Sequence, residues 1–140
     1  MTKKDVAIER MLNGDASGRL RLLHNQLVSI GLKTRMPSNS STLLFQAVDN
    51  NGKRLDLAAL RDAGGDVLSF PSSYWRSRMA ELESALTSID KSHFIGTGGS
   101  FTTSQYSARQ VSVSAVTIAS LERVASGLIA SHVREITGDA

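Results

Sequence analysis

TLLFQAVDNNGKRLDL, residues 42–57, is the stretch that decides the fold of this chain. Apolar residues recur at every second position from Leu43, which puts Leu43, Phe45 and Ala47 on one face of a strand. Asn51-Gly52 is the pair most typical of a two-residue type I′ hairpin turn. Such a turn would place Val48 opposite Leu55 and Asp49 opposite Arg54. The stretch therefore predicts a β-hairpin, and the hairpin predicts an antiparallel sheet.

Further strands are expected on the C-terminal side of this hairpin. A short apolar run at 67–70 ends at Pro71, and an alternating run at 110–116 places Val111, Val113 and Ala115 on one face. Residues 55–63 fit either the second hairpin strand or one to two helical turns. A short strand is also considered at 93–95.

Helical spacing of apolar residues marks four more segments. The first spans 5–12, with Val6, Met11 and Leu12 as its apolar anchors, and Asn13-Gly14 ends it. The others are a second helix capped by Asp15 or Ser17 and ended by Gly31, a third from Ser72 or Ser73 to about residue 88, and a last from Thr117 to about Ile136. Their apolar stripes are Leu20, Leu23, Leu27 and Ile30; Trp75, Met79, Leu82, Leu86 and Ile89; and Ile118, Leu121, Val124, Leu128, Ile129, Val133 and Ile136.

The order of these elements indicates a single α+β domain over residues 1–140. We expect a mostly antiparallel sheet of about four to five strands, helices packed on one face, and a long C-terminal helix. The apolar fraction of 41% and the charged fraction of 21% are those of an ordinary globular chain.

Several kinds of chemistry lack support in the sequence. The chain has no cysteine, so it can form neither a disulfide nor a thiolate centre. His24, His93 and His132 form no metal-binding pattern, no serine-hydrolase elbow is present, and no cofactor motif is complete. We therefore expect no metal and no cofactor, and favour a protein that is not an enzyme. No export signal or membrane-spanning run is seen, which favours a cytoplasmic protein of bacterial or mobile-element origin.

Basic residues suggest an anionic partner. The net charge is +3, and residues 1–40 carry most of the excess. Residues 73–78 also combine aromatic residues with arginines. This combination suits nucleic acid, because aromatic rings stack on bases and guanidinium groups pair with phosphates. The candidate nucleic-acid contacts are Arg19, Arg21, Lys33, Arg35, Tyr74, Arg76 and Arg78.

A glycine-rich segment at 96–107 offers a different site, because successive backbone N–H groups in such a turn can hold a phosphate. The segment lacks the lysine of a P-loop. Its candidate ligand-binding residues are Thr97, Gly98, Gly99, Ser100, Thr102 and Thr103.

The layout also resembles a family of small α+β domains of unknown role, found alone or beside DNA restriction and modification proteins, some of them labelled predicted transport proteins. The matching features are the stripe of the second helix, the hairpin from Leu43 to Leu57, and the segment from Gly96 to His132. The resemblance implies a binding module linked to DNA. Three hypotheses follow: a nucleic-acid-associated interaction module, a small-molecule or phosphate-binding domain or enzyme built on 96–107, and a structural subunit of a homodimer or larger assembly.

Overall fold

Five strands form one antiparallel sheet in which each strand pairs with the next along the chain. The computed structural model describes residues 2–14, 17–36, 42–61, 66–95 and 107–138. The strands are β1 (Lys33–Arg35), β2 (Thr42–Val48), β3 (Arg54–Arg61), β4 (Val67–Pro71) and β5 (Ser107–Ser112).

Helices precede the sheet, interrupt it between β4 and β5, and follow it. The first two are α1 (Lys3–Asn13) and α2 (Arg19–Ser29). The insertion holds α3 (Ser72–Trp75), a 3₁₀ turn η1 (Arg76–Arg78), α4 (Met79–Ala85) and a second 3₁₀ turn η2 (Lys91–His93). The C-terminal helix is continuous from α6 (Ile118–Val124) through a π-helical turn η3 (Ala125–Ile129) to α7 (Ala130–Thr137). None of the described helices is long and apolar enough to cross a membrane.

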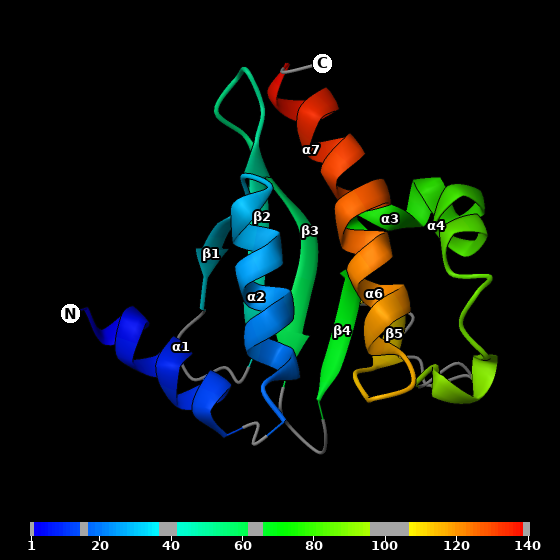
Figure 1. Ribbon diagram of the computed structural model, residues 1–140. Coiled ribbons are helices and arrows are strands. Elements are labelled where there is room, and N and C mark those ends of the chain that lie inside the picture. Colours follow the sequence, from blue (N-terminus) through cyan, green and yellow to red (C-terminus); the bar gives the residue numbers. More distant parts are fainter. Residues whose placement is uncertain (1, 15–16, 37–41, 62–65, 96–106, 139–140) are drawn as a thin grey trace.

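The sheet has one covered face and one open face. Helix α2 and the C-terminal helix lie over the same side of the sheet (Figure 1). On the opposite side, Lys33, Arg35 and Arg54 are exposed, whereas Gln46, Ala59, Ser69 and Gln110 are buried. This arrangement confirms the expected α+β fold, with helices on one face and a long helix at the C-terminus.

Alternation along β2 explains which face is covered. Leu43, Phe45 and Ala47 are buried beneath the helices, as predicted. On β4, Leu68 and Phe70 point to the same side. The helices contribute the expected apolar stripes to this core, with these members fully buried: Leu20, Leu23, Leu27, Leu121 and Ile129.

The hairpin forms, but with a longer turn than the predicted type I′. Ala47 pairs with Leu55 and Val48 with Arg54, one residue away from the expected register. The amide of Gly52 donates to the carbonyl of Asp49, and Gly52 has a φ of 81°. This is the pattern of a three-residue loop with a left-handed glycine. The Asp49 side chain favours it, because its Oδ1 accepts the amides of Asn51 and Lys53 at 2.9 Å each.

The third predicted helix is broken into pieces although its apolar stripe holds. Arg78 Nη1 donates to the carbonyl of Tyr74 at 2.7 Å, which is the carbonyl that a helical Arg78 amide would otherwise use. The backbone there is a 3₁₀ turn, and α4 begins at Met79. A guanidinium thus replaces a backbone donor at the point where the helix breaks.

Other boundaries also differ from expectation. Strand β1 was not predicted, and residues 55–61 resolve as strand rather than helix. Strand β5 begins and ends earlier than 110–116, and the segment 93–95 contributes only an isolated bridge from Phe94 to Val111. The first helix buries Ile8 in place of the expected Val6, which is exposed. Gly18 rather than Asp15 or Ser17 is the N-cap residue of α2.

Candidate functional site

Basic side chains gather on the open face of the sheet. Residues that pair across antiparallel strands point to the same side. Lys33 and Arg35 pair with Gln46 and Leu44, while Arg54 and Arg61 pair with Val48 and Thr42. These alternate residues of β2 point away from the helices. Lys33, Arg35, Arg54 and Arg61, here called the basic face, therefore stand on one side across three neighbouring strands.

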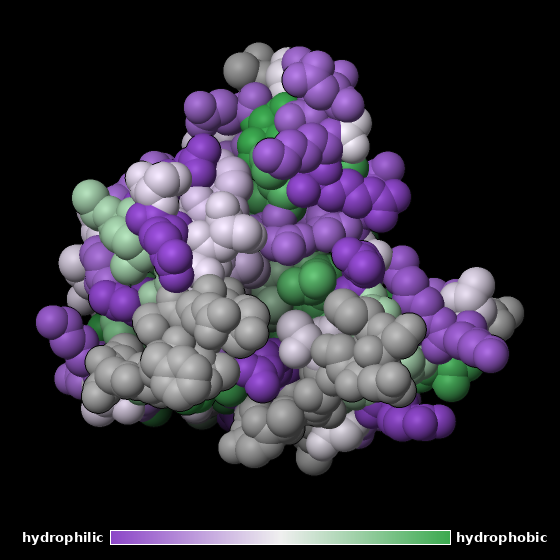
Figure 2. Space-filling view, turned by 180° about the vertical axis from the view of Figure 1, so that it is seen from behind, coloured by the Kyte–Doolittle hydropathy of each residue, from purple (hydrophilic) through white to green (hydrophobic). Residues whose placement is uncertain are grey.

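One acidic residue shares that side among the strand residues. Asp56 pairs with Gln46, and its Oδ1 accepts a hydrogen bond of 2.7 Å from Gln46 Nε2. The remaining neighbours are uncharged and mostly polar, including Ser69 and Gln110 on the two following strands. Four cations against one carboxylate give this face an excess of positive charge. Figure 2 views the molecule from this side and shows hydrophilic side chains mainly over its upper and right-hand parts.

A hollow with a volume of about 340 Å³ lies over the middle of the sheet. Strands β2 to β5 and the start of α3 form its walls. Arg61 and Asp56 are its charged residues, and hydroxyl groups supply most of the other polar atoms. The lining residues are Thr42, Leu44, Asp56, Ala59, Arg61, Ser69, Pro71, Ser72, Ser73 and Ser107.

Two polar groups in this hollow are buried without a hydrogen-bond partner. Ser69 is 2% exposed, and its Oγ has no partner. The Nε of Arg61 is also buried and unpaired. Buried polar atoms are normally satisfied, because an unpaired one costs about 1–3 kcal/mol. Both residues line the hollow, so each has an unsatisfied hydrogen-bonding group beside it.

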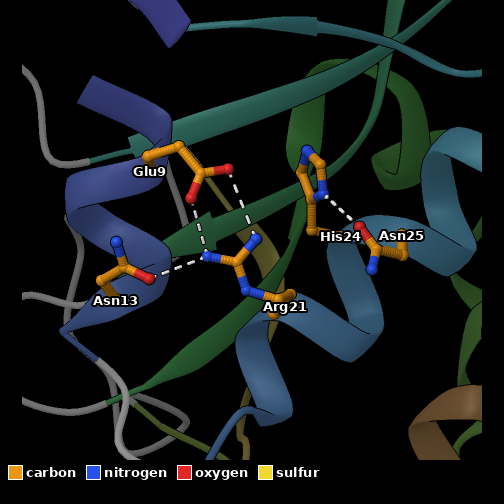
Figure 3. A network of polar contacts seen from close by, with 5 residues as sticks. All are labelled: Glu9, Asn13, Arg21, His24 and Asn25. Carbon is orange, nitrogen blue, oxygen red and sulfur yellow. Dashed lines mark hydrogen bonds and ion pairs between the residues drawn. The ribbon is translucent and has the colours of Figure 1, made fainter. Parts of the chain in front are cut away.

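The structure separates the predicted basic residues instead of bringing them together. Lys33 and Arg35 lie on the basic face. Arg19 and Arg21 belong to α2 and so lie on the helix side. Arg21 is bound to α1, because its Nη2 lies 2.8 Å from Glu9 Oε2 and 2.9 Å from Asn13 Oδ1 (Figure 3). The hydrogen bond from Arg21 lowers the pKa of Glu9, and the same bond raises the pKa of Arg21.

Tyr74 does not present its ring to a base. It is 6% exposed, and the guanidinium carbon of Arg78 lies 4.0 Å from its ring centroid. Arg76 is exposed on the same 3₁₀ turn. The predicted stacking role of Tyr74 therefore conflicts with its burial, and Arg78 is engaged with Tyr74 itself.

Tyr74 belongs instead to a chain of hydrogen bonds that is buried at Tyr74 and His132 and reaches the surface at Glu81. Its hydroxyl lies 2.6 Å from Nδ1 of His132, and Nε2 of His132 lies 2.6 Å from Oε1 of Glu81. A hydroxyl, an imidazole and a carboxylate in this order match the arrangement of an activated nucleophile. Trp75 packs edge-on against the rings of Tyr74 and His132. None of the three hydrogen-bonded residues, Tyr74, His132 and Glu81, lines the hollow. This geometry ties α3 and α4 to α7 and serves the fold.

Burial gives this network a pH dependence. Desolvation raises the pKa of Tyr74 above its ordinary value near 10; Glu135 and Glu81 add to the increase and Arg78 opposes it. The unfolded chain therefore loses this proton first as the pH rises. We expect stability to fall above pH 10, by at most about 1.4 kcal/mol per pH unit for one proton. Chemical denaturation at pH 8 and pH 11 measures the free energy of unfolding at each pH. Tyr74→Phe should remove the part of the decrease that is due to the Tyr74 hydroxyl. An equal loss in both proteins would contradict the assignment.

Some predicted site residues cannot be placed. Thr97, Gly98, Gly99, Ser100, Thr102 and Thr103 lie outside the described residues. Within the described ranges, no group of His, Asp and Glu side chains could hold a metal ion. His24 is partly exposed and contacts Asn25 (Figure 3).

Sequence reasoning missed Arg54 and Arg61, two of the four cations of the basic face. Both belong to β3, and residues 55–63 fit either a strand or one to two helical turns. The available signal was the alternation of β2 carried across the hairpin; the predicted register gives Arg61 its observed partner Thr42, whereas Arg54 required the correct turn length.

Comparison with known proteins adds no assignment. The chain matches no protein-family model, and neither the curated proteins nor the solved structures contain a match to it.

Proposed function

We propose that this protein is a non-enzymatic module that binds nucleic acid through the basic face of its sheet. The observation that supports this proposal is the strand register, which sets Lys33, Arg35, Arg54 and Arg61 on one open side with Asp56 as the one acidic strand residue there. Phosphate contacts supply most sequence-independent affinity for nucleic acid. A cysteine-free chain also suits the reducing cytoplasm, where we place it.

The open surface supports a binding role better than a catalytic one. Lys33 and Arg35 are exposed, so their cationic groups can reach a polyanion without rearrangement of the fold. None of the described strand residues on this side is aromatic, which favours backbone contacts over base stacking. We therefore expect weak sequence preference and strong dependence on salt.

A charged edge strand has another ordinary use, which the experiment must separate from binding. Lysine on a short edge strand prevents the edge from pairing with other sheets. Lys33 and Arg35 lie on such a strand, β1. If that were their sole role, replacing them would promote association of the protein and leave its contact with nucleic acid unchanged.

The test is fluorescence anisotropy with a labelled single strand of mixed sequence, between about 50 and 200 mM salt. Each phosphate contact contributes about −0.7 to the slope of log K against log salt, so four contacts predict a slope near −3. The double variant Lys33→Gln, Arg35→Gln should weaken that slope by about 1.4.

The matched control removes two cations from the helix side. Arg123 and Arg134 are exposed on α6 and α7, and the pair Arg123→Gln, Arg134→Gln makes the same change in net charge. We expect nearly unchanged binding from it, with sedimentation used to confirm that every variant is monodisperse. Absence of binding at 50 mM salt, or an equal effect of the two pairs, would overturn the proposal.

A further inference from the structure

The hollow on the open face has the features of a small-ligand site, and this inference is independent of whether the surrounding face binds a polyanion. Its volume of about 340 Å³ lies at the lower end of the range for small-molecule sites. Lys33, Arg35 and Arg54 are exposed on the same side of the sheet, whereas the residues that line the hollow include buried polar atoms. Those atoms define what the hollow can hold.

One end of the hollow is built to receive an anion. The buried Nε–H of Arg61 and the buried hydroxyl of Ser69 both lack a partner, so each has a hydrogen to donate. Ser107 lines the opposite end of the hollow, because it pairs with Pro71, about 13 Å along β4 from Val67, the partner of Arg61. Its Oγ accepts from Gln110 Nε2 at 3.2 Å, and its hydroxyl hydrogen remains available to a ligand group at that end. An arginine with a neighbouring hydroxyl is a donor set that suits a phosphate group.

The other charged residue restricts what the phosphate can be attached to. Asp56 lines the hollow and already accepts one hydrogen bond, from Gln46. A carboxylate has further lone pairs, and it would accept from a ligand hydroxyl. It pairs with Gln46 whereas Arg61 pairs with Thr42, so the two charges stand at separate points along β3. A ligand with a phosphate at one end and hydroxyl groups at the other satisfies both.

We propose that this hollow binds a sugar carrying a phosphate monoester. Arg61 and Ser69 hold the phosphate, and Asp56 and Ser107 at the other end contact the sugar hydroxyls. Two sources share this chemistry. One is a free sugar phosphate or mononucleotide, and the other is the terminal phosphate of a nucleic-acid strand lying along the basic face.

Isothermal titration with ribose 5-phosphate, AMP and ribose tests the site. We expect saturable binding of the two phosphates at up to millimolar concentration and no binding of ribose. Arg61→Gln should weaken binding about tenfold or more and Ser69→Ala several-fold, as loss of a charged and of a neutral hydrogen bond predicts. Arg123→Gln is the matched control, because it removes one exposed cation from the helix side, away from the hollow and from the basic face, and it should change affinity less than about twofold.

Anisotropy with otherwise identical 5′-phosphorylated and 5′-hydroxyl strands identifies the source. A preference for the phosphorylated strand that Ser69→Ala abolishes assigns the strand end. Equal binding of the two strands, together with binding of ribose 5-phosphate, assigns the free metabolite. Should no phosphate bind and the terminal phosphate make no difference, the proposal is wrong, whereas salt-dependent binding of the strand would still stand. Equal weakening by Arg61→Gln and Arg123→Gln would also overturn it, because the effect would then come from the net charge of the protein.

Discussion

Replacing Trp75 with alanine should lower the free energy of unfolding by about 4 kcal/mol. Trp75 is fully buried at the junction of α3 with the sheet. Its ring packs edge-on against Phe70 and Tyr74, and its Nε1 donates to the carbonyl of Leu57 at 2.8 Å. The alanine variant leaves both a cavity and an unpaired carbonyl. Loss of that much free energy is a large part of the total stability of a domain this size.

Trp75→Phe separates the two contributions. It keeps most of the aromatic volume and removes the N–H donor to Leu57, so we expect a smaller loss of about 1–3 kcal/mol. The measurement is urea denaturation followed by far-UV circular dichroism, since Trp75 is the chain's one tryptophan and its fluorescence disappears with it. A loss below about 1 kcal/mol for Trp75→Ala would show that this junction contributes little to the fold.

His132→Ala is the second large effect, with an expected loss of about 3 kcal/mol. The imidazole is 5% exposed and lies between the Tyr74 hydroxyl and Glu81. Removing it leaves a cavity beside Trp75 and a buried hydroxyl without its partner. The variant therefore loses packing and a hydrogen bond at the same point.

A double-mutant cycle tests whether Tyr74 and His132 act through their hydrogen bond. Tyr74→Phe alone removes the hydroxyl, and in a His132→Ala background the same change should cost less by about 1 kcal/mol. Glu81→Gln is the control at the exposed end of the chain of contacts, since the Glu81 side chain is 53% exposed, and it should cost under about 1 kcal/mol. Additive losses for Tyr74 and His132 would contradict the coupling.

Apolar periodicity was sufficient to predict most of the fold. The spacing of apolar residues in α2, in the C-terminal helix and in β2 indicates which side chains are buried. Each of these patterns lies within one short segment, so it could be recognised without knowledge of the rest of the chain. The stripe at Trp75, Leu82, Leu86 and Ile89 is buried as expected, even though the helix that carries it is broken. Burial was thus more predictable than backbone continuity, because Arg78 can satisfy a backbone carbonyl with its side chain.

The candidate site was predicted only in part. Lys33 and Arg35 reach the open face, but Arg19, Arg21 and Arg78 are placed elsewhere or engaged by neighbours such as Glu9 and Tyr74. An uneven distribution of charge along the sequence does not predict on which face of the sheet a charged residue lies. No sequence motif marks the hollow at Ser69 and Arg61, because the residues that line it come from separate strands.

By itself, the sequence determined an antiparallel α+β domain without cysteine chemistry, because composition and periodicity are local properties of the chain. The tertiary structure decided the surface. The Asp49 side chain lengthens the hairpin turn and moves Arg54 opposite Val48, whereas the irregular step between Phe45 and Gln46 returns Arg61 to Thr42, the partner that the predicted register would also give it. A shift of one residue reverses the side to which a strand residue points. Turn geometry, rather than the hydrophobic pattern, therefore placed Arg54 on the open face.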